Sequence, residues 1–372
     1  MITKNISILG SYTSKFGELW DKSLADLLFE AIGGVLKNST VEPDQIDAIF
    51  VANMAAGSFN DQRHLNAIAS QYFVHFPPAY RLEGACASGG LAVESAVLGL
   101  LSGMYKTVLV VGVEKMTDSE VSKVTEILAT AANTNLEYGA TFAALYALLT
   151  QAYQNKFGTN REQLSAVAVK NHRHALKNTN AQFQKEITID QVNNSTVVSS
   201  PLRLLDCSPI SDGSAAVILS VENVKNKPKI IGFGHGQDSI DLARRTNLTE
   251  LKATKIAAEK AYRMAGLTAK DIAVAEVHDC FTIAEILAIE DLGFFAKGTG
   301  GIATAEDKTT FGGTIVINPS GGLKACGHPV GATGVKQIAN IYELIAEDQY
   351  AVGLTHNVGG SGATAVVHII TK

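Results

Sequence analysis

The chain has 372 residues, enough for about two domains, and its 46% hydrophobic and 18% charged residues exclude disorder as the main state. Its 31 basic and 36 acidic residues give a net charge of −5, which argues against a nucleic-acid-binding protein, since such proteins present a basic surface. Its four cysteines include no CxxC pair, which argues against both a disulfide scaffold and a structural zinc site.

Strand-like and helical segments alternate along the chain, beginning with an apolar run that indicates a first strand rather than a signal peptide. Further strand-like runs lie at residues 45–54, 107–113, 213–219, 271–280, 351–357 and 362–368. Several are continuously apolar, which predicts parallel-rich sheets covered by helices on both faces. The least charged helical stretch, residues 138–155, is interrupted by polar residues, which favours a buried helix over a membrane span. We therefore expect a cytoplasmic protein that does not associate with a membrane.

Three pairs of segments recur in the same order along the chain. The strand-like runs that begin at residues 45 and 271 are 226 residues apart, the segments that begin at residues 85 and 325 are 240 apart, and the runs that begin at residues 107 and 351 are 244 apart. This order predicts two copies of one α/β unit, residues 1–221 and residues 228–372. The first copy would carry an insertion at residues 117–205, and the polar segment 223–229 would join the copies.

Cys86 lies in the small-residue segment GACASGG, directly before an apolar helical pattern. A thiol at a helix N-terminus faces unpaired backbone N–H groups and the positive end of the helix dipole, which favour the reactive thiolate. The small neighbouring side chains leave room for an acyl group. A buried apolar cysteine at a helix start is the alternative, and this segment by itself leaves both interpretations open.

His328 lies in a second dense segment, because residues 321–331 contain four glycines and a His-Pro dipeptide. Pro329 suits the first turn of a helix, so we expect His328 at a helix N-terminus, related to Cys86 by the repeat. If the copies pack about a pseudo-two-fold axis, Cys86 and His328 converge as the pair that thiolate catalysis needs. The alternative is a glycine-rich turn with an incidental histidine.

Polar residues also follow two strand-like runs of the second copy. His278 and Cys280 end the run IAVAEV and share a strand face, and His356 ends the run YAVGLT. Because α/β proteins place ligand sites at the carboxyl ends of parallel strands, these residues are site candidates. The other cysteine and histidines that we considered are predicted to be structural (Cys207, His368) or on the solvated face of an insertion helix (His172, His174).

The motifs GACASGG, HDCF, GHPVGATG and HNVGG, in this order, resemble those of the thiolase superfamily, and specifically its sterol-carrier-type thiolases. The segments REQLSAVAVKNHRHAL and LRLLDCSPISDGSAAV extend the likeness over almost the whole chain. Two motifs depart from the common degradative and biosynthetic thiolases: HDCF stands in place of Asn-Glu-Ala, and His356-Asn357-Val358 in place of the terminal Cys-x-Gly. The sterol-carrier-type group shares both departures.

The resemblance implies the five-layered αβαβα thiolase fold, with two repeated halves and an insertion (loop) domain over the active site. It also implies reversible acyl transfer between coenzyme A thioesters, with Cys86 as the acylated nucleophile and His328 as the base that deprotonates it. Cys280 would be the acid/base at C2 of acetyl-CoA, tuned by His278 and His356. The backbone N–H groups at Cys86 and at Gly359–Gly360 would form one oxyanion hole, and His278 the enolate hole.

The resemblance also has consequences for ligands and partners. Coenzyme A and acyl-CoA would be substrates, with no permanently bound cofactor and no metal, and basic residues of the insertion (Lys170, Arg173, Arg203) could meet the phosphates. The family is usually dimeric, so we expect a homodimer or a dimer of dimers. Some archaeal relatives work with a small OB-fold protein, which makes such a protein a candidate partner.

Three other functions remain open at this point. A decarboxylating ketosynthase also has a cysteine at a helix start, although GHPVGATG favours a thiolase. A thioester-binding scaffold without turnover would explain the missing terminal Cys-x-Gly. A channelling subunit of a complex with a condensing synthase is the third alternative.

Overall fold

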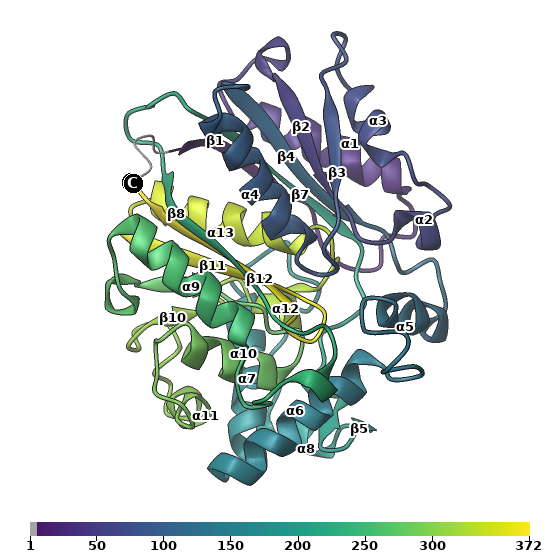
Figure 1. The fold of residues 1–372 in the computed structure, drawn as a ribbon, viewed down its shortest axis with the longest axis vertical. Coiled ribbons are helices and arrows are strands. Elements are labelled where there is room, and N and C mark those ends of the chain that lie inside the picture. The colour runs from purple at the N-terminus through teal and green to yellow at the C-terminus, as the bar shows by residue number, and fades with distance from the viewer. Residues whose placement is uncertain (1–5) are drawn as a thin grey trace.

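The computed structural model describes residues 6–372, which form one ten-stranded sheet, a separate two-stranded ribbon and helices on both sides of the sheet (Figure 1). The strand order in the large sheet is β10-β9-β11-β12-β8-β1-β7-β4-β2-β3. Its strands are β1 (Ile6–Thr13), β2 (Ala48–Ala52), β3 (Ala79–Leu82), β4 (Thr107–Glu114), β7 (Gly213–Ser220), β8 (Lys229–Gln237), β9 (Val274–Glu276), β10 (Val316–Ile317), β11 (Val352–Gly359) and β12 (Thr364–Thr371).

The sheet consists of two half-sheets of the same design. From the middle outwards the first half runs β1-β7-β4-β2-β3, and the second runs β8-β12-β11-β9-β10. In each half, strands two and three in chain order pair in parallel at the outer edge, and the last strand pairs antiparallel with both of its neighbours. Among the described residues, the two half-sheets pair with each other at Ile6–Ile230 and Ser7–Lys229. This arrangement supports the predicted division at residues 221–228, which remains our proposal for the domain bounds.

Helices complete five layers. The outer face of the first half-sheet is covered by α1 (Leu24–Lys37) and α3 (Leu65–Ser70), and that of the second by α9 (Lys252–Ala265) and α10 (Thr282–Asp291). Between the half-sheets lie α4 (Ser88–Leu101) and α13 (Thr333–Ala346), side by side in Figure 1, and their buried side chains join residues of both halves in one apolar core. The predicted αβαβα architecture is therefore confirmed.

The helices α4 and α13 approach each other more closely than side chains would allow. A Cβ atom on Gly89 would lie 2.6 Å from the backbone nitrogen of Gly334, and one on Gly334 would lie 2.3 Å from the backbone nitrogen of Gly90. Real side-chain contacts are not this short, so the crossing requires glycine in both helices.

The insertion lies beneath both halves in Figure 1 and contains α5 (Val121–Ala129), α6 (Phe142–Phe157), α7 (Arg161–Ala175), α8 (Ile189–Asn194), β5 (Val197–Ser199) and β6 (Leu202–Arg203). Thr141 caps α6 by accepting a hydrogen bond from the backbone of Ala144, and Asn160 caps α7 in the same way. The apolar faces of α6 and α7 pack on α10 of the second half. The insertion therefore brings side chains from the first half of the chain to strand ends of the second half.

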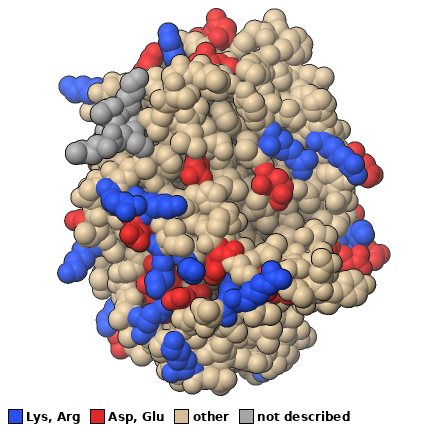
Figure 2. All heavy atoms as spheres, viewed as in Figure 1, with Lys and Arg blue, Asp and Glu red and all other residues tan. Residues whose placement is uncertain are grey.

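Three short helices and four 3₁₀ turns complete the described elements. The helices are α2 (Ala56–Phe59), α11 (Gly300–Ala305) and α12 (Gly322–Cys326), and the turns lie at Pro43–Gln45, Leu204–Asp206, Leu242–Arg244 and Ala269–Asp271. Among the described residues no helix is both long enough and apolar enough to cross a membrane. Figure 2 shows basic and acidic side chains intermixed on the face seen in Figure 1, without a continuous basic surface there.

One local prediction was wrong. The segment around His328 and Pro329 does not begin a helix: α12 ends at Cys326, and α13 begins only at Thr333. Gly327 ends α12 with a φ of 116° and a ψ of 162°, a non-helical conformation that favours glycine. His328 therefore lies in an irregular loop in front of α13, five residues before the helix.

Candidate active site

Cys86 is held at a tight turn between β3 and α4. Ala85 has a φ of 53°, in the left-handed region that residues with a side chain avoid, so the turn is strained. The Ser88 hydroxyl stabilises it by donating to the Ala85 carbonyl oxygen at 2.6 Å and accepting from the Gly84 N–H at 3.0 Å. The turn places the Cys86 thiol in front of the N-terminus of α4, as the sequence predicts.

The hydrogen bonds of His328 fix which of its ring nitrogens carries the proton. The Thr333 hydroxyl donates to the Pro329 carbonyl oxygen at 3.0 Å, so it accepts from His328 Nδ1–H, 2.7 Å away. The proton is thus assigned to Nδ1, and Nε2 keeps a free lone pair. His328 Nε2 is buried without a hydrogen-bond partner among the described residues, so it is available to accept a proton.

His278 has the opposite tautomer. Its Nδ1 accepts from the Asn357 side-chain amide at 3.4 Å, which assigns the proton to Nε2. His278 Nε2 is likewise buried without a partner among the described residues. The two imidazole rings stand edge to face with their centres 5.1 Å apart. One ring therefore presents a donor and the other an acceptor to the same space.

The two histidines and the nucleophile converge as predicted. Cys86 Sγ and one nitrogen each of His278 and His328 all lie within 4.8 Å of one another. A divalent ion such as zinc accepts this ligand set, but the opposite tautomers of the two rings equally suit proton transfer and hydrogen bonding to a substrate oxygen.

Asn357 connects the nucleophile with His278, and the sequence analysis did not assign it a role. Its amide nitrogen donates to the Cys86 carbonyl oxygen at 2.9 Å, and its amide oxygen accepts from the Gly90 N–H at 2.9 Å. Asn357 lies on β11, while Gly90 lies on α4 and Cys86 on the turn before it, so Asn357 ties the two halves together. Its place in the HNVGG motif was the available signal.

Both ring nitrogens of His356 are engaged and its side chain faces away from Cys86, so its predicted catalytic role stays a prediction. It is fully buried, its Nε2 is bonded to the Thr254 hydroxyl at 2.8 Å, and its Nδ1 accepts from the His278 backbone N–H at 3.5 Å. Neighbouring side chains of a strand point to opposite faces, so Asn357 faces Cys86 while His356 faces α9. His356 supports the backbone of His278 instead.

Cys280 is 7% exposed, and its thiol is close enough to that of Cys86 for the two to interact electrostatically. Burial raises the pKa of its thiol well above the usual range, and the neighbouring Cys86 raises it further. The backbone N–H of Phe281 and the side chain of Tyr146 act in the opposite direction. Tyr146 comes from α6 of the insertion and is another residue that the sequence analysis missed, because it sits within an ordinary apolar helix pattern.

The resting state of Cys86 differs from the expected thiolate. Burial raises the pKa of its thiol to about 12, and the Glu114 carboxylate adds to this, while the Gly360 N–H lowers it. Burial also lowers the pKa of His328 to about 3. The helix N-terminus is therefore outweighed by desolvation, and the resting pair is a neutral thiol and a neutral imidazole.

Comparisons with known proteins agree with this geometry. Residues 6–223 match the family model of the thiolase N-terminal domain, and residues 234–372 match that of a thiolase C-terminal domain-like family. The chain belongs to the thiolase family. An acetyl-CoA acetyltransferase of Methanothermobacter thermautotrophicus is 44% identical over 99% of this chain and 100% of its own length. Human sterol carrier protein 2 is 30% identical over 98% of this chain and 71% of its own length. The structure of human mitochondrial 3-ketoacyl-CoA thiolase superposes with a TM-score of 0.78 at 18% identity, covering 100% of both chains.

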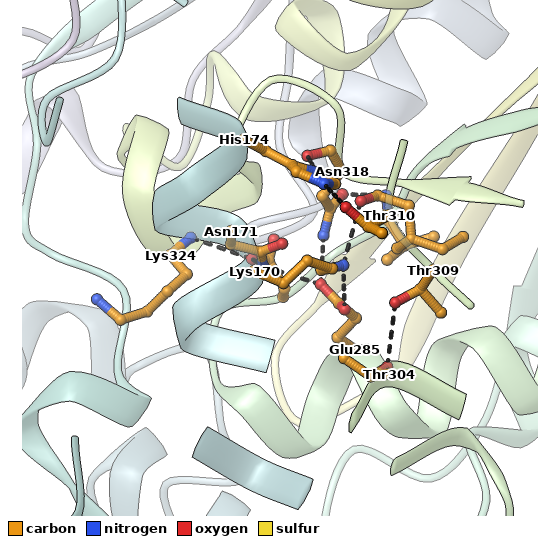
Figure 3. A network of polar contacts seen from close by, with 12 residues as sticks. Lys170, Asn171, His174, Glu285, Thr304, Thr309, Thr310, Asn318 and Lys324 are labelled. Atoms are coloured by element: carbon orange, nitrogen blue, oxygen red, sulfur yellow. Dashed lines mark hydrogen bonds and ion pairs between the residues drawn. The ribbon is translucent and has the colours of Figure 1, made fainter. Parts of the chain in front are cut away.

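Behind the site of this thiolase lies a buried polar network around Glu285 (Figure 3), and Asp279 is connected to it through Asn171. Asp279 accepts hydrogen bonds from the backbone of Leu323 at 2.7 Å and of Lys324 at 3.1 Å, and so holds α12 and the loop that carries His328. Asn171 of α7 donates to both carboxylates, at 2.7 and 2.8 Å. Burial and the nearby Glu285 raise the pKa of Asp279 to about 7.

The network corrects the prediction for Lys170. Its ammonium group is 2% exposed, forms an ion pair with Glu285 at 2.5 Å and donates to the Ile317 carbonyl oxygen at 3.1 Å (Figure 3). It therefore cannot meet the phosphates of coenzyme A. Arg173 is partly exposed and paired with Asp307 at 2.6 Å, and Arg203 donates to the Ser195 carbonyl oxygen at 2.8 Å. These two residues stay candidates for phosphate binding.

His172 and His174 are also placed differently from the prediction of a solvated helix face. Both are 1% exposed, because α11, α12 and α8 cover the faces of α7 that its polar sequence suggested were open. His174 bonds the Asn318 carbonyl oxygen at 3.0 Å and the Thr310 hydroxyl at 2.8 Å (Figure 3).

Buried neutral histidines make stability depend on pH. His368, on β12, is fully buried, its Nε2 has no partner among the described residues, and burial lowers its pKa to about 3. Below about pH 6.5 the unfolded chain binds a proton there that the folded chain does not, so stability falls as the pH falls from 6.5 towards 3. We expect His368→Leu to make this loss shallower by up to about 1.4 kcal/mol per pH unit, measured by urea denaturation between pH 6.5 and 5. His64→Leu, at an exposed histidine, is the control and should leave the pH slope as in the wild type. An unchanged pH slope in His368→Leu would show that His368 does not cause the loss of stability.

Proposed function

We propose that this thiolase catalyses reversible acyl transfer to coenzyme A, forming acetoacetyl-CoA from two acetyl-CoA molecules and cleaving it in reverse. One observation carries the proposal: the Cys86 sulfur and one ring nitrogen each of His328 and His278 lie within 4.8 Å of one another, and the Cys280 thiol is close enough to interact electrostatically with that of Cys86. The names of the acetyl-CoA acetyltransferases of Methanothermobacter thermautotrophicus and of Methanocaldococcus jannaschii, 44% and 42% identical, support it.

In the first step His328 Nε2 takes the proton of the Cys86 thiol, and the sulfur attacks the thioester carbonyl carbon of acetyl-CoA. The N–H groups of Cys86 and Gly360 stabilise the oxyanion that forms, and Gly359 shapes this oxyanion hole. A Cβ on Gly359 would lie 2.5 Å from the Gly84 carbonyl oxygen, so only glycine lets β11 come this close to the nucleophile. The carbon–sulfur bond to coenzyme A then breaks, and His328 returns the proton to the leaving thiolate.

In the second step Cys280, as its thiolate, removes a proton from C2 of a second acetyl-CoA. The negative charge that develops on the thioester oxygen is stabilised by His278 Nε2–H. The C2 carbanion attacks the acetyl group on Cys86, and the Cys86 sulfur leaves. Acetoacetyl-CoA is the product. The Cys86 thiolate that leaves then takes up the proton held on Cys280, which returns both sulfurs to their starting state. In the cleavage direction Cys280 delivers this proton to C2.

The space for the substrate lies beside the nucleophile. A cavity of about 790 Å³ is lined by Gly84, Ala85 and Gly360 and by the arginines Arg63 and Arg81. We assign it to the acyl and pantetheine parts of acyl-CoA, which serves as substrate while no cofactor stays permanently bound. Arg173 and Arg203 stay our candidates for the phosphates.

We also propose that the chain is a cytoplasmic homodimer or dimer of dimers. Among the described residues no strand pairs with the outer side of the edge strand β3, and the apolar side chains of Val74, Phe76 and Tyr80 near it are 96%, 65% and 44% exposed. A small OB-fold protein is a further candidate partner. It is supported by a solved complex titled Ltp2-ChsH2(DUF35) aldolase, which superposes with a TM-score of 0.86 at 21% identity over 100% of this chain and 98% of its own.

Turnover distinguishes an enzyme from a thioester-binding scaffold. We expect the purified protein to convert acetoacetyl-CoA to acetyl-CoA only when coenzyme A is added, because the acetyl group on Cys86 must be passed to a second thiol. Chromatographic separation of the CoA esters measures this directly. Binding of acetoacetyl-CoA without any cleavage in the presence of coenzyme A would favour the scaffold.

A further inference from the structure

Glu114 is the last residue of β4, and its carboxylate is fully buried. Its Oε1 accepts from the Asn53 side-chain amide at 3.0 Å and from the Ala55 N–H at 3.0 Å. Its Oε2 accepts from the Met54 N–H at 2.9 Å and from the Gly331 N–H at 3.0 Å. The carboxylate therefore joins the segment after β2, in the first half, to the loop in front of α13, in the second half.

Both of these segments belong to the active site. The segment after β2 lines the cavity that we assign to the acyl and pantetheine parts of the substrate. The loop in front of α13 carries His328, three residues before Gly331. A Cβ atom on Gly331 would lie 2.7 Å from Glu114 Oε2 and 2.7 Å from Asn53 Cα, so the loop comes this close only because the residue is glycine. Glu114 thus connects the cavity wall with the loop of the base.

We propose that Glu114 is a positioning residue for His328: its carboxylate holds the loop by accepting from a backbone N–H, and so sets the distance between the imidazole and the Cys86 sulfur. This inference rests on the proposed function, in which His328 takes the proton of the Cys86 thiol. All four partners of the carboxylate among the described residues are N–H donors, so a proton on either oxygen would face a donor. The ionised form is therefore the one that holds the loop.

The groups around Glu114 decide when it is ionised. Burial raises the pKa of its carboxyl to about 7, while the three backbone N–H groups and the Arg81 guanidinium of β3 lower it. Besides burial, the Glu114 carboxylate raises the pKa of the Cys86 thiol in front of α4. The ammonium group of the next residue, Lys115, is paired with Asp212 at 2.8 Å. Glu114 therefore loses its charge as the pH falls through about 7.

The test is Glu114→Gln, whose amide keeps the shape of the side chain and resembles its protonated form. We expect single-turnover acetylation of Cys86 at pH 8 to fall by about 10- to 100-fold, because a small displacement of a catalytic group has an effect of this order. The wild-type rate should itself fall between pH 8 and pH 6, so the ratio of the two rates should shrink. Asp279, whose pKa burial also raises to about 7, is present in both proteins and does not affect this comparison.

Two results would overturn the inference. A ratio of the two rates that is the same at every pH is what a merely structural role gives. Faster acetylation in Glu114→Gln would show that the negative charge beside Cys86, which raises the pKa of the thiol together with burial, matters more than the position of the loop.

Glu290→Gln is the matched control. Glu290 is also a buried carboxylate that accepts from two backbone N–H groups, those of Gly298 at 3.0 Å and Gly300 at 2.8 Å, and it lies outside the converging cluster. We expect this variant to acetylate Cys86 as the wild type does at every pH.

Hydrogen exchange supplies a measurement that does not depend on turnover. Mass spectrometry of peptides that contain Gly331 reports how well its N–H is protected, after correction for the pH dependence of intrinsic exchange. Exchange should be faster in Glu114→Gln than in the wild type at pH 8, and the wild type should lose protection between pH 8 and pH 6, a comparison that needs no variant. Equal protection in all of these samples would overturn the role of Glu114 even if the protein proves to be an active thiolase. Lost protection would support the role even if no acetylation is seen, and the proposed function would then be what fails.

Discussion

Replacing Cys86 with alanine will abolish covalent acetylation of the protein by acetyl-CoA. The Cys86 sulfur lies within 4.8 Å of a ring nitrogen of His328, and His328 Nε2 is buried without a partner among the described residues, so the thiol proton has an acceptor. We expect one acetyl group per chain in the wild type and none in Cys86→Ala, measured by intact-protein mass spectrometry after a brief incubation with acetyl-CoA.

Peptide mapping supplies the control for this result. Cys207 is a partly exposed free cysteine outside the converging cluster, so Cys207→Ala should retain full acetylation on Cys86. An acetyl group mapped to Cys280, Cys326 or Cys207 in the wild type would show that the nucleophile is misassigned. His328→Ala should slow acetylation without moving it to another residue, because it removes the proton acceptor alone.

Replacing Cys280 with alanine will separate the two half-reactions. Acylation of Cys86 needs only the pair with His328 and the oxyanion hole, so the acetyl group should still appear in a single turnover. Formation of acetoacetyl-CoA should fall by about 10²- to 10⁴-fold, the usual cost of losing one positioned acid/base group. Cys280→Ser should be nearly as poor, because a hydroxyl is far less acidic than a thiol.

The competing hypothesis makes His356 the base at C2. Under it His356→Ala would lose condensation while Cys280→Ala kept most of it. Both ring nitrogens of His356 are engaged, with Thr254 and with the His278 backbone, so we expect His356→Ala to act more mildly, through the position of His278. Cys326 is buried outside the cluster, and Cys326→Ala is the matched control. Near-wild-type condensation by Cys280→Ala would decide against Cys280.

The sequence was informative about the site where a motif follows a repeated strand or helix. The repeat related the Cys86 and His328 segments across the two halves, and HDCF marked His278 and Cys280. The predicted strand is shorter than expected, because β9 ends at Glu276, so these two residues lie in the segment after it and not on a shared strand face. The motifs could not assign tautomers, because these depend on Thr333 and Asn357, whose roles appear only when α13 and β11 lie against the nucleophile. The sequence could not show that Asn357 rather than His356 faces Cys86, because neighbouring side chains on β11 point to opposite faces of the sheet.

Burial explains the remaining errors. The polar sequence of α7 is typical of a solvated helix, yet the insertion folds it against α10, α11 and α12 and pairs Lys170 with Glu285. Whether such side chains are buried or exposed depends on which helices pack against α7, and those helices are far from it in the sequence. The same desolvation reverses the expected ionisation of Cys86, whose pKa rises to about 12.

The close glycine contact between α4 and α13 makes the geometry of the active site depend on how the two halves of this thiolase pack together. Cys86 lies on a turn that leads into α4, and His328 lies on a loop that leads into α13. The distance between the thiol and the imidazole therefore depends on the distance between the two helices where they cross. A methyl group at Gly89 or Gly334 would push the two helices apart. It would thereby lengthen the distance between the Cys86 thiol and the His328 imidazole without contacting either group. Catalytic rate is thus a more sensitive reporter of how the two halves dock than any spectroscopic signal of helix content, which would register the same displacement only after the helices themselves had melted.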